Sequence, residues 1–429
     1  MAKRASLNAL AREDYPIHNW YRFVLSFPPH LVRTYLKRFG ANRNTLVLDP
    51  FCGTGTTLVE CKKLGIPGIG IEAHPMSFFA SKVKIDWEVD PDGLERHAEC
   101  VAAKALADLQ NTGIPDIPIR FSGEENLQTR SLPLEQHKLL LAHSISPLPL
   151  YKTLVLLDAL IQDKNPCYEQ YERLALAKAL ISSISNLYFG PEVGVGTIKK
   201  DAAVIEPWLK GVQTMVNDLK VLSDRDVPSQ VLQGDARSLP GLLPRQSVDM
   251  VITSPPYPNE KDYTRTTRLE SVLLGFLQTR SDLRSVKHQL LCSNTRTVYK
   301  DNHDDRYITD QSKIQELADS IEMRRIELGK TSGFERLYAR TTRLYFGGMY
   351  RHLADLRDVL RPGAYLAYVV GDQASYFRIP IRTGALLASL AESLGYEAIG
   401  IDLFRTRLAT STREHLREEV VLLRWMGSK

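Results

Sequence analysis

The sequence of 429 residues lacks the cysteine spacing of a disulfide framework or a zinc site. Its cysteines number five, and no two of them form a Cys-x-x-Cys pair. Disulfide frameworks normally use an even number of cysteines, and structural zinc sites use closely spaced pairs. We therefore expect no disulfide framework and no bound metal.

Long apolar runs are also missing. A membrane-spanning helix needs about 18 to 20 consecutive apolar residues, and no stretch of this sequence reaches that length. Residues 1–14 lack the apolar core of a secretory signal peptide as well. We therefore expect a cytoplasmic protein with no membrane partner.

Internal repeats and low-complexity tracts are absent too. Hydrophobic residues make up 43% and charged residues 24% of the chain, which is typical of a globular protein rather than a disordered one. The length allows one catalytic domain with insertions, or two domains.

The excess of positive charge is small. A net charge of +5 permits a polyanionic partner without proving one. Lys and Arg outnumber Asp and Glu by 8 to 2 in residues 1–48 and by 16 to 13 in residues 258–345, but residues 112–230 have 12 against 14. If nucleic acid binds, residues 1–48 and 258–345 are the better candidates.

Residues 45–72 have the pattern of a βαβ unit. A short apolar run ends at Asp49, a turn with Gly53 and Gly55 follows, residues 57–64 read as a helix, and residues 68–72 read as a second strand ending in Glu72. Buried strands of parallel sheets are brief apolar runs of this kind. The unit predicts a doubly wound α/β sheet.

The glycine turn lacks two phosphate-binding features. No Gly-Lys-Ser/Thr follows Gly53, as a P-loop requires, and position 58 is Leu58 where a dinucleotide fingerprint needs glycine. A nucleoside without pyrophosphate fits better. Glu72 can accept hydrogen bonds from both ribose hydroxyls, Asp49 can face a cationic amino group, and Asp235 can meet an adenine amine.

Residues 253–257 read Thr-Ser-Pro-Pro-Tyr at the end of the apolar run 248–253. Two consecutive prolines remove two backbone donors, so the turn presents carbonyl groups beside an aromatic ring. Such a turn suits a flat ligand with an NH2 group, and this indicates methylation of the amine of a nucleobase.

The remaining pattern alternates between helices and strands. Further strands are predicted over residues 230–235, 365–370, 397–404 and 419–425, and helices over residues 31–39, 76–111, 168–185, 207–222, 341–360 and 382–394. The helix over residues 76–111 is expected to break near Pro91.

The residues 49–55 (Asp-Pro-Phe-Cys-Gly-Thr-Gly) together with residues 253–257 resemble the cofactor and catalytic motifs of the class I S-adenosylmethionine-dependent DNA amino methyltransferases. The resemblance implies a mostly parallel seven-stranded methyltransferase sheet, doubly wound, and S-adenosyl-L-methionine as the cofactor. Residues 27–31 (Phe-Pro-Pro-His-Leu) resemble the family segment that covers the methionine end of the cofactor. The cofactor-binding residues implied are Pro28, His30, Asp49, Phe51, Cys52, Gly53, Gly55, Thr56, Glu72, Asp235 and Ala236.

The Ser-Pro-Pro-Tyr form resembles the branch of the family that methylates cytosine N4, whereas the adenine-N6 branch more often begins with Asp or Asn. The catalytic residues implied are Ser254, Pro255, Pro256 and Tyr257. Ser254 Oγ and the Pro255 carbonyl would accept hydrogen bonds from the amine, and Tyr257 would stack on a base flipped out of the duplex.

Other readings stay open. The same fold could methylate adenine N6 or, in RNA, guanine N2, and a silent DNA-binding protein is a reading of another class. Carbon-5 methylation of cytosine normally needs a Pro-Cys-Gln turn. The only Pro-Cys here, Pro166-Cys167, is followed by Tyr168, so we expect an ordinary helical cysteine there.

Residues 258–339 leave directly from Tyr257 and are expected to recognise DNA. Residues 258–268 and 290–300 mix the basic, amide and aromatic side chains that hold phosphates and base edges. The expected DNA-binding residues are Lys261, Tyr263, Arg265, Arg268, Asn294 and Arg296. Gly371, Asp372 and Gln373 are candidates for the rim of the site. The expected partners are double-stranded DNA and a separately encoded restriction endonuclease.

Five segments follow from this pattern. Residues 1–111 are predicted to form the N-terminal arm and the cofactor-binding half of the sheet, and residues 112–229 an α-rich insertion. Residues 230–257 continue the sheet to the catalytic motif, residues 258–339 recognise the target, and residues 340–429 complete the methyltransferase domain. This order of motifs resembles the arrangement called gamma in the family.

Overall fold

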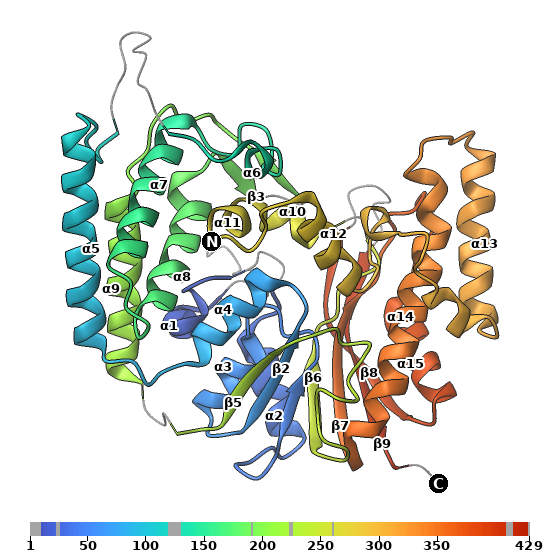
Figure 1. Ribbon diagram of the computed structural model, residues 1–429. Helices are drawn as coiled ribbons and strands as arrows, with labels where there is room; N and C mark the ends of the chain where they lie inside the picture. The colour runs from blue at the N-terminus through green and yellow to red at the C-terminus, as the bar shows by residue number, and fades with distance from the viewer. Residues whose placement is uncertain are drawn as a thin grey trace, which may run out of the picture.

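A seven-stranded sheet forms the centre of the computed structural model, which describes residues 10–22, 26–118, 130–189, 192–222, 226–259, 261–408 and 415–427. The strand order is β5-β2-β1-β6-β7-β9-β8 (Figure 1). The strands are β1 (Val47–Asp49), β2 (Gly68–Glu72), β5 (Ser229–Gln233), β6 (Val248–Thr253), β7 (Leu360–Gly371), β8 (Glu397–Leu408) and β9 (His415–Trp425).

The pairing confirms the predicted fold class. Strands β5, β2, β1, β6 and β7 pair in parallel, and only β9 runs antiparallel to its neighbours β7 and β8. The carboxyl ends of the parallel strands therefore meet at one edge of the sheet, where ligands bind in doubly wound folds. Since Gly371 pairs with Glu418, the start of β9 lies at this edge too.

Alternate side chains of the strands pack on opposite faces. Met250 and Ile252 pack against α2 (Pro29–Arg38), whereas Val251 faces the layer formed by α14 (Tyr338–Val359) and α15 (Thr383–Ser393). Because both faces of β6 are covered, its residues form a nearly continuous apolar run, as expected for a parallel strand.

The remaining helices extend the layer on the β5 side (Figure 1). Helices α3 (Thr56–Lys63) and α4 (Pro75–Ile85) adjoin a helical block. In this block α5 packs against α7 and α9, and α8 packs against α9, so α5 belongs with the helices that follow it. The block contains α5 (Pro91–Asn111), α6 (Leu134–His137), α7 (Pro147–Gln162), α8 (Glu169–Ala179), the π-helix η2 (Leu180–Ile184), the hairpin β3 (Leu187–Phe189) and β4 (Val193–Val195), and α9 (Ile205–Val221).

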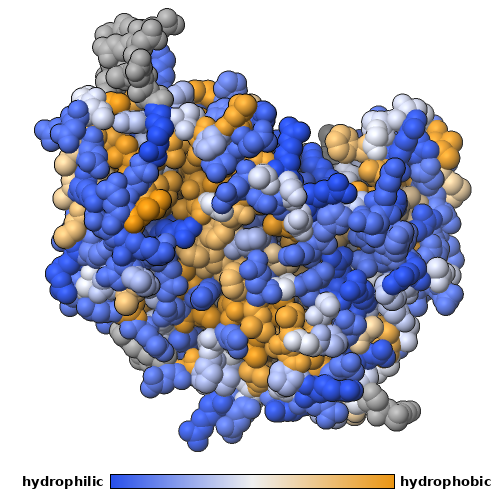
Figure 2. All heavy atoms as spheres, in the orientation of Figure 1, coloured by the Kyte–Doolittle hydropathy of each residue, from blue (hydrophilic) through white to orange (hydrophobic). Residues whose placement is uncertain are grey.

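Residues 261–339 form short helices that cross from the helical block to the far side of the sheet (Figure 1). Figure 2 shows the surface hollowed between the helical block and the part that carries α13. The elements are α10 (Tyr263–Thr266), α11 (Arg268–Leu273), α12 (Arg280–Gln289), η3 (Thr295–Thr297), η4 (Asp304–Ile308), α13 (Ser312–Glu327) and η5 (Glu335–Leu337).

The N-terminal arm contributes η1 (Arg12–Asp14) and α1 (Tyr15–His18). Among the residues that the structure describes, no helix is both long and apolar enough to cross a membrane.

Candidate active site

A cavity of about 490 Å³ opens at the carboxyl edge of the sheet. Its walls combine the glycine turn after β1, the ends of β2 and β5, the turn after β6 and the carboxyl end of β8. These walls come from distant parts of the sequence, and they meet here because the parallel strands end at the same edge of the sheet.

The glycine turn takes a backbone path that suits glycine. Gly55 precedes α3 with φ of 83°, a left-handed conformation that L side chains rarely adopt. A Cβ atom on Gly55 would also lie 3.0 Å from Ser81 Cβ in α4. The turn is thus pressed closely against α4, and the neighbouring Gly53 and Thr54 line the cavity.

Glu72 holds the turn in place and lines the cavity. Its Oε2 accepts a hydrogen bond from the Gly53 backbone N–H at 2.8 Å, and its Oε1 accepts one from the His74 N–H at 2.8 Å. Each carboxylate oxygen can accept a second hydrogen bond, so the pair of ribose hydroxyls of a nucleoside fits this carboxylate. Burial raises the pKa of Glu72 to about 7.

Asp49 lies behind the cavity wall rather than on it. The carboxylate is fully buried and accepts hydrogen bonds from the Thr57 and Thr253 hydroxyls, each at 2.6 Å. Burial raises its pKa to about 6. Asp49 therefore joins the glycine turn to the catalytic strand, and it has no surface on which to meet a ligand amino group directly.

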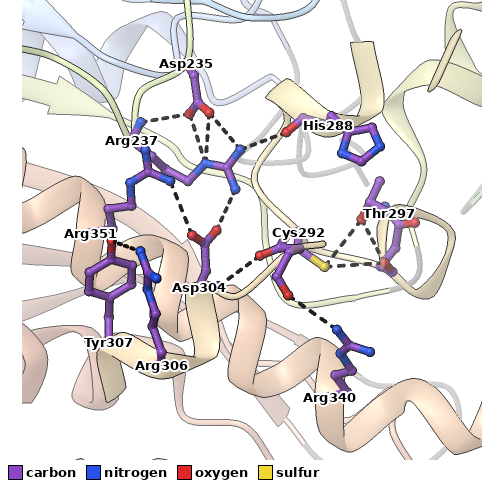
Figure 3. Close-up of polar contacts among 12 residues, drawn as sticks. Asp235, Arg237, His288, Cys292, Thr297, Asp304, Arg306, Tyr307, Arg340 and Arg351 are labelled. Atoms are coloured by element: carbon purple, nitrogen blue, oxygen red, sulfur yellow. Dashed lines mark hydrogen bonds and ion pairs between the residues drawn. The ribbon is translucent and has the colours of Figure 1, made fainter. Parts of the chain in front are cut away.

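Asp235 lines the cavity but is also held by an arginine (Figure 3). Arg237 Nη2 donates to Asp235 Oδ2 at 2.7 Å and to the His288 carbonyl at 3.0 Å, and Arg237 Nη1 donates to Asp304 Oδ2 at 2.7 Å. The guanidinium thus connects the loop after β5 to α12 and η4. Asp235 also accepts hydrogen bonds from the Arg237 backbone N–H and Nε, so Arg237 takes up most of the acceptor capacity of this carboxylate and compensates its charge.

The turn after β6 presents its side chains to the cavity. Ser254 Oγ donates a hydrogen bond to the Val369 carbonyl at 3.1 Å and also lies within hydrogen-bonding reach of the Tyr257 hydroxyl, so its oxygen keeps the capacity to accept a further hydrogen bond. Beside it, the Tyr257 ring packs so closely on Gly371 that a Cβ atom there would lie 2.8 Å from Tyr257 Cε2. Gly371 therefore provides the space that Tyr257 occupies at the end of β7.

The structure brings together all four predicted catalytic residues and most of the predicted cofactor residues. Those that line the cavity are Phe51, Cys52, Gly53, Thr56, Glu72, Asp235, Ala236, Ser254, Pro255, Pro256 and Tyr257. Pro28, His30, Asp49 and Gly55 do not line it. In the N-terminal arm, Ser26 and Phe27 line the cavity, and the predicted Pro28 and His30 do not. Pro28 is the residue directly before α2, and His30 lies within that helix.

The predicted DNA-binding residues divide into two groups. Lys261 and Tyr263 line the cavity, whereas the other four do not. Asn294 is buried and donates to the Lys261 carbonyl at 3.1 Å. Arg268 donates to the Thr264 carbonyl at 3.0 Å and to the Leu139 carbonyl at 3.2 Å. Asn294 and Arg268 therefore have partners within the protein, and their predicted contact with DNA stays a prediction.

Arg265 and Arg296 lie outside the cavity, with the Arg296 guanidinium over the Phe334 ring. Tyr263 lies toward the cofactor side, since burial and the Glu72 carboxylate raise its pKa to about 12. Cys167 is exposed in the turn before α8 and not in a helix, and it does not line the cavity.

The sequence reasoning missed cavity residues from several places, among them the start of α4 and the end of the chain. His74 and Ser77 come from the start of α4, directly after Glu72, and their position one turn past a strand end could have identified them. The end of the chain supplies Phe404, Arg405, Arg407 and Glu418. No local pattern points to these residues, because they reach the site through the pairing of β8 and β9 with β7.

Comparison with known proteins agrees with this geometry. Residues 8–79 match the family model described as DNA methylase. The chain is 26% identical to the type II methyltransferase M.BsoBI of Geobacillus stearothermophilus, over 94% of this chain and 83% of that protein. It is 24% identical to the type II methyltransferase M.AvaI of Anabaena variabilis, over 94% of this chain and 84% of that protein.

Among solved structures, the rRNA methyltransferase AviRa of Streptomyces viridochromogenes aligns with a TM-score of 0.32 and 10% identity, covering 96% of this chain and 94% of that one. The DNA methylase match and the two type II methyltransferases confirm the resemblance to class I DNA methyltransferases of the N4/N6 type, and with it S-adenosylmethionine as the cofactor.

Proposed function

We propose that the chain transfers a methyl group from S-adenosylmethionine to the N4 amine of a flipped-out cytosine in double-stranded DNA, in the cytoplasm. The observation that carries the proposal is the Ser254 hydroxyl, which lies in the cavity with its hydrogen donated to the Val369 carbonyl. The Ser254 oxygen can therefore accept a hydrogen bond from an incoming amine, while the hydroxyl hydrogen is already donated to Val369.

The N4 nitrogen of cytosine is a poor nucleophile because its lone pair is delocalised into the ring. Hydrogen bonds accepted from its two N–H groups by Ser254 Oγ and the Pro255 carbonyl favour a more tetrahedral nitrogen. Its lone pair could then attack the methyl carbon of the cofactor, with the C–S bond breaking to release the neutral thioether as the N–C bond forms, and the methylated nitrogen would lose one proton. The bound cofactor supplies the electrophilic methyl group. Rate enhancement at such a site comes mainly from positioning and preorganised dipoles.

The shape of the site requires the base to leave the duplex. Ser254 and Tyr257 lie in a cavity at the end of the sheet, and a base stacked in a duplex cannot reach a pocket of this kind. Flipping costs a few kcal/mol, roughly what stacking on an aromatic ring and hydrogen bonds in the pocket offset. Tyr257 is the stacking ring in this proposal.

A role in restriction and modification completes the proposal. M.BsoBI and M.AvaI are named type II methyltransferases, and the similarity covers nearly all of this chain. We therefore expect a cognate restriction endonuclease that cuts the same DNA sequence.

The target base is tested by labelling DNA of random sequence with tritiated S-adenosylmethionine, digesting it to nucleosides and identifying the product. N4-methylcytosine supports the proposal. N6-methyladenine would refute the choice of base while leaving DNA amine methylation intact. If RNA is labelled in parallel, N2-methylguanine formed in the RNA with no product in the DNA would refute both. No transfer and no heat of cofactor binding would support the silent DNA-binding protein.

The Ser254→Ala variant tests the role of the hydroxyl. We expect methyl transfer to fall by about 10²-fold or more, as when one preorganised hydrogen-bonding group is removed from an active site. Cofactor affinity measured by calorimetry should stay within about twofold of the wild-type value, since the loss of one neutral hydroxyl group changes binding only slightly. Ser247→Ala is the matched control, because Ser247 precedes the opposite end of β6 and bonds only the Pro244 carbonyl. Equal losses of transfer and cofactor affinity would contradict the assigned role.

A further inference from the structure

Two cationic side chains from distant parts of the sequence share the rim of the cavity. Lys261 follows the catalytic turn after β6, and Arg407 lies near the carboxyl end of β8. Burial and the nearby Arg407 guanidinium lower the pKa of Lys261. Both side chains line the same cavity, so an anion bound at this rim would meet two positive charges.

The local acids offset only part of the positive charge at this rim. Glu418 accepts hydrogen bonds from Arg405, whose Nε and Nη2 donate to its two oxygens at 2.6 and 2.9 Å. The same carboxylate forms a longer ion pair with Arg407 Nε at 3.7 Å, so two guanidinium groups share it. Glu192 is the other acid of this rim; its side chain is exposed to solvent, and its charge, like that of Glu418, acts on Lys261. Three cations, Lys261, Arg405 and Arg407, therefore meet two acids here.

The hydrogen bonds of Arg407 go to uncharged groups. Its Nη2 donates to the Asp372 carbonyl at 3.2 Å and to Gln373 Oε1 at 3.1 Å, while the Asp372 carboxylate pairs with Arg382 at 2.7 Å. Within the part of the chain that the structure describes, the Lys261 ammonium makes no hydrogen bond or ion pair. The rim thus keeps positive charge available for a ligand.

The cation pair lies on the target side of the cavity. A Cβ atom at Gly371 would approach both the Tyr257 ring, at 2.8 Å, and Glu418 Cγ, at 3.4 Å. Glu418 and Tyr257 are therefore neighbours, and Arg407 adjoins Glu418. The cofactor carboxylates Glu72 and Asp235 belong to the walls formed by β2 and β5, on the other side of β1 and β6.

We infer that Lys261 and Arg407 form a binding site for a backbone phosphate of the flipped nucleotide. A base that stacks on Tyr257 brings its own phosphate groups to the rim. The planar guanidinium and the flexible ammonium are the two groups that proteins use to hold phosphate oxygens. This inference rests on the proposed function and deepens it, because it assigns the strand β8 to DNA binding.

Binding of a short single-stranded DNA of mixed sequence tests this site without base flipping or methyl transfer. For single strands, the slope of log affinity against log salt concentration falls by about 0.7 for each phosphate contact. We expect Lys261→Gln and Arg407→Gln each to reduce the slope, and the double variant to reduce it by about 0.7 in total, because the two cations hold one phosphate. Calorimetry should give an unchanged affinity for S-adenosylmethionine.

Arg245→Gln is the control with the same change of charge. Arg245 is 84% exposed and lies before β6, at the amino edge of the sheet, so its slope should equal that of the wild type. Wild-type slopes in both rim variants would overturn the phosphate site, and so would an equal reduction in Arg245→Gln. If the proposed function is wrong, the wild-type protein will not transfer methyl groups to DNA. The salt dependence of single-stranded DNA binding tests the phosphate site independently of that result.

Discussion

At the scale of single residues, two acids at neighbouring strand ends have different tasks. Asp49 and Glu72 end β1 and β2, and burial raises the pKa of each, to about 6 and about 7. The sequence predicted both as ligand-binding acids because both follow apolar strands. Only the packing of the turn decided that Glu72 faces the cavity and Asp49 faces Thr57 and Thr253.

The raised pKa of Glu72 predicts that cofactor affinity depends on pH. Below about pH 7 the folded, ligand-free protein holds the Glu72 carboxyl in its protonated form, and this form has to lose its proton before it accepts both ribose hydroxyls. Affinity should therefore weaken as the pH falls through 7, by up to about tenfold for each unit. Calorimetric titrations with S-adenosylmethionine at a series of pH values measure the effect.

Glu72→Gln is the matched variant for this measurement. Glutamine has a similar shape but does not titrate, so the variant should bind more weakly at high pH and show a flatter profile near pH 7. A profile as steep as that of the wild type would assign the dependence to another group, with Asp49 the next candidate because its pKa is about 6.

At the scale of elements, the glycine pair Gly347 and Gly348 inside α14 allows the segment of residues 261–339 to pack closely against this helix. A Cβ atom at Gly347 would lie 2.0 Å from the Asp304 carbonyl oxygen of η4, and one at Gly348 would lie 2.5 Å from Leu291 Cδ1. Glycine is normally unfavourable in a helix interior. Here it lets the backbone of η4 approach that of α14, and this fixes Asp304 beside Arg237.

The Gly347→Ala substitution should therefore destabilise the protein although alanine favours helices. We expect a loss of about 1 to 3 kcal/mol in the free energy of unfolding, because the added methyl group displaces backbone atoms of η4. Denaturant titration followed by circular dichroism measures it. Gly211→Ala in α9 is the control, since its Cβ atom would meet only Ala175 Cβ at 3.4 Å.

The control should gain up to about 1 kcal/mol from helix propensity. A gain of the same sign in Gly347→Ala would show that η4 is not held where the structure places it.

At the scale of the whole molecule, Arg237 joins the loop after β5 to the segment of residues 261–339. Its guanidinium is buried between Asp235, which lines the cavity, and Asp304 of η4 (Figure 3). The loop after β5 and residues 288–304 thus meet through one side chain.

Arg237→Gln should lower the free energy of unfolding by about 3 kcal/mol, since it removes the buried cation between two carboxylates and leaves Asp304 only its longer ion pair with Arg351 at 3.4 Å. The affinity for S-adenosylmethionine should fall with it, because Asp235 loses the groups that orient it. Arg245→Gln serves as the control, as its ion pair with Asp358 is exposed and 3.7 Å long, and such pairs contribute about 1 kcal/mol at most. An equal effect in both variants would contradict the role of Arg237.

The sequence by itself determined the fold class, the cofactor turn and the catalytic turn. These features depend on local patterns: brief apolar runs for the strands, Gly53 and Gly55 for the turn after β1, and residues 254–257 at the end of β6. Each is specified by backbone preferences and side-chain chemistry within a few residues, so it can be read without the rest of the chain.

Only the tertiary structure decided which of these residues reach the cavity. Strand pairing across the sheet brought Arg407 and Glu418 to the rim beside Tyr257. Hydrogen bonds to backbone carbonyls gave Asn294 and Arg268 partners within the protein. The physical reason is that a side chain's partners are set by contacts between segments far apart in sequence, which no local pattern contains.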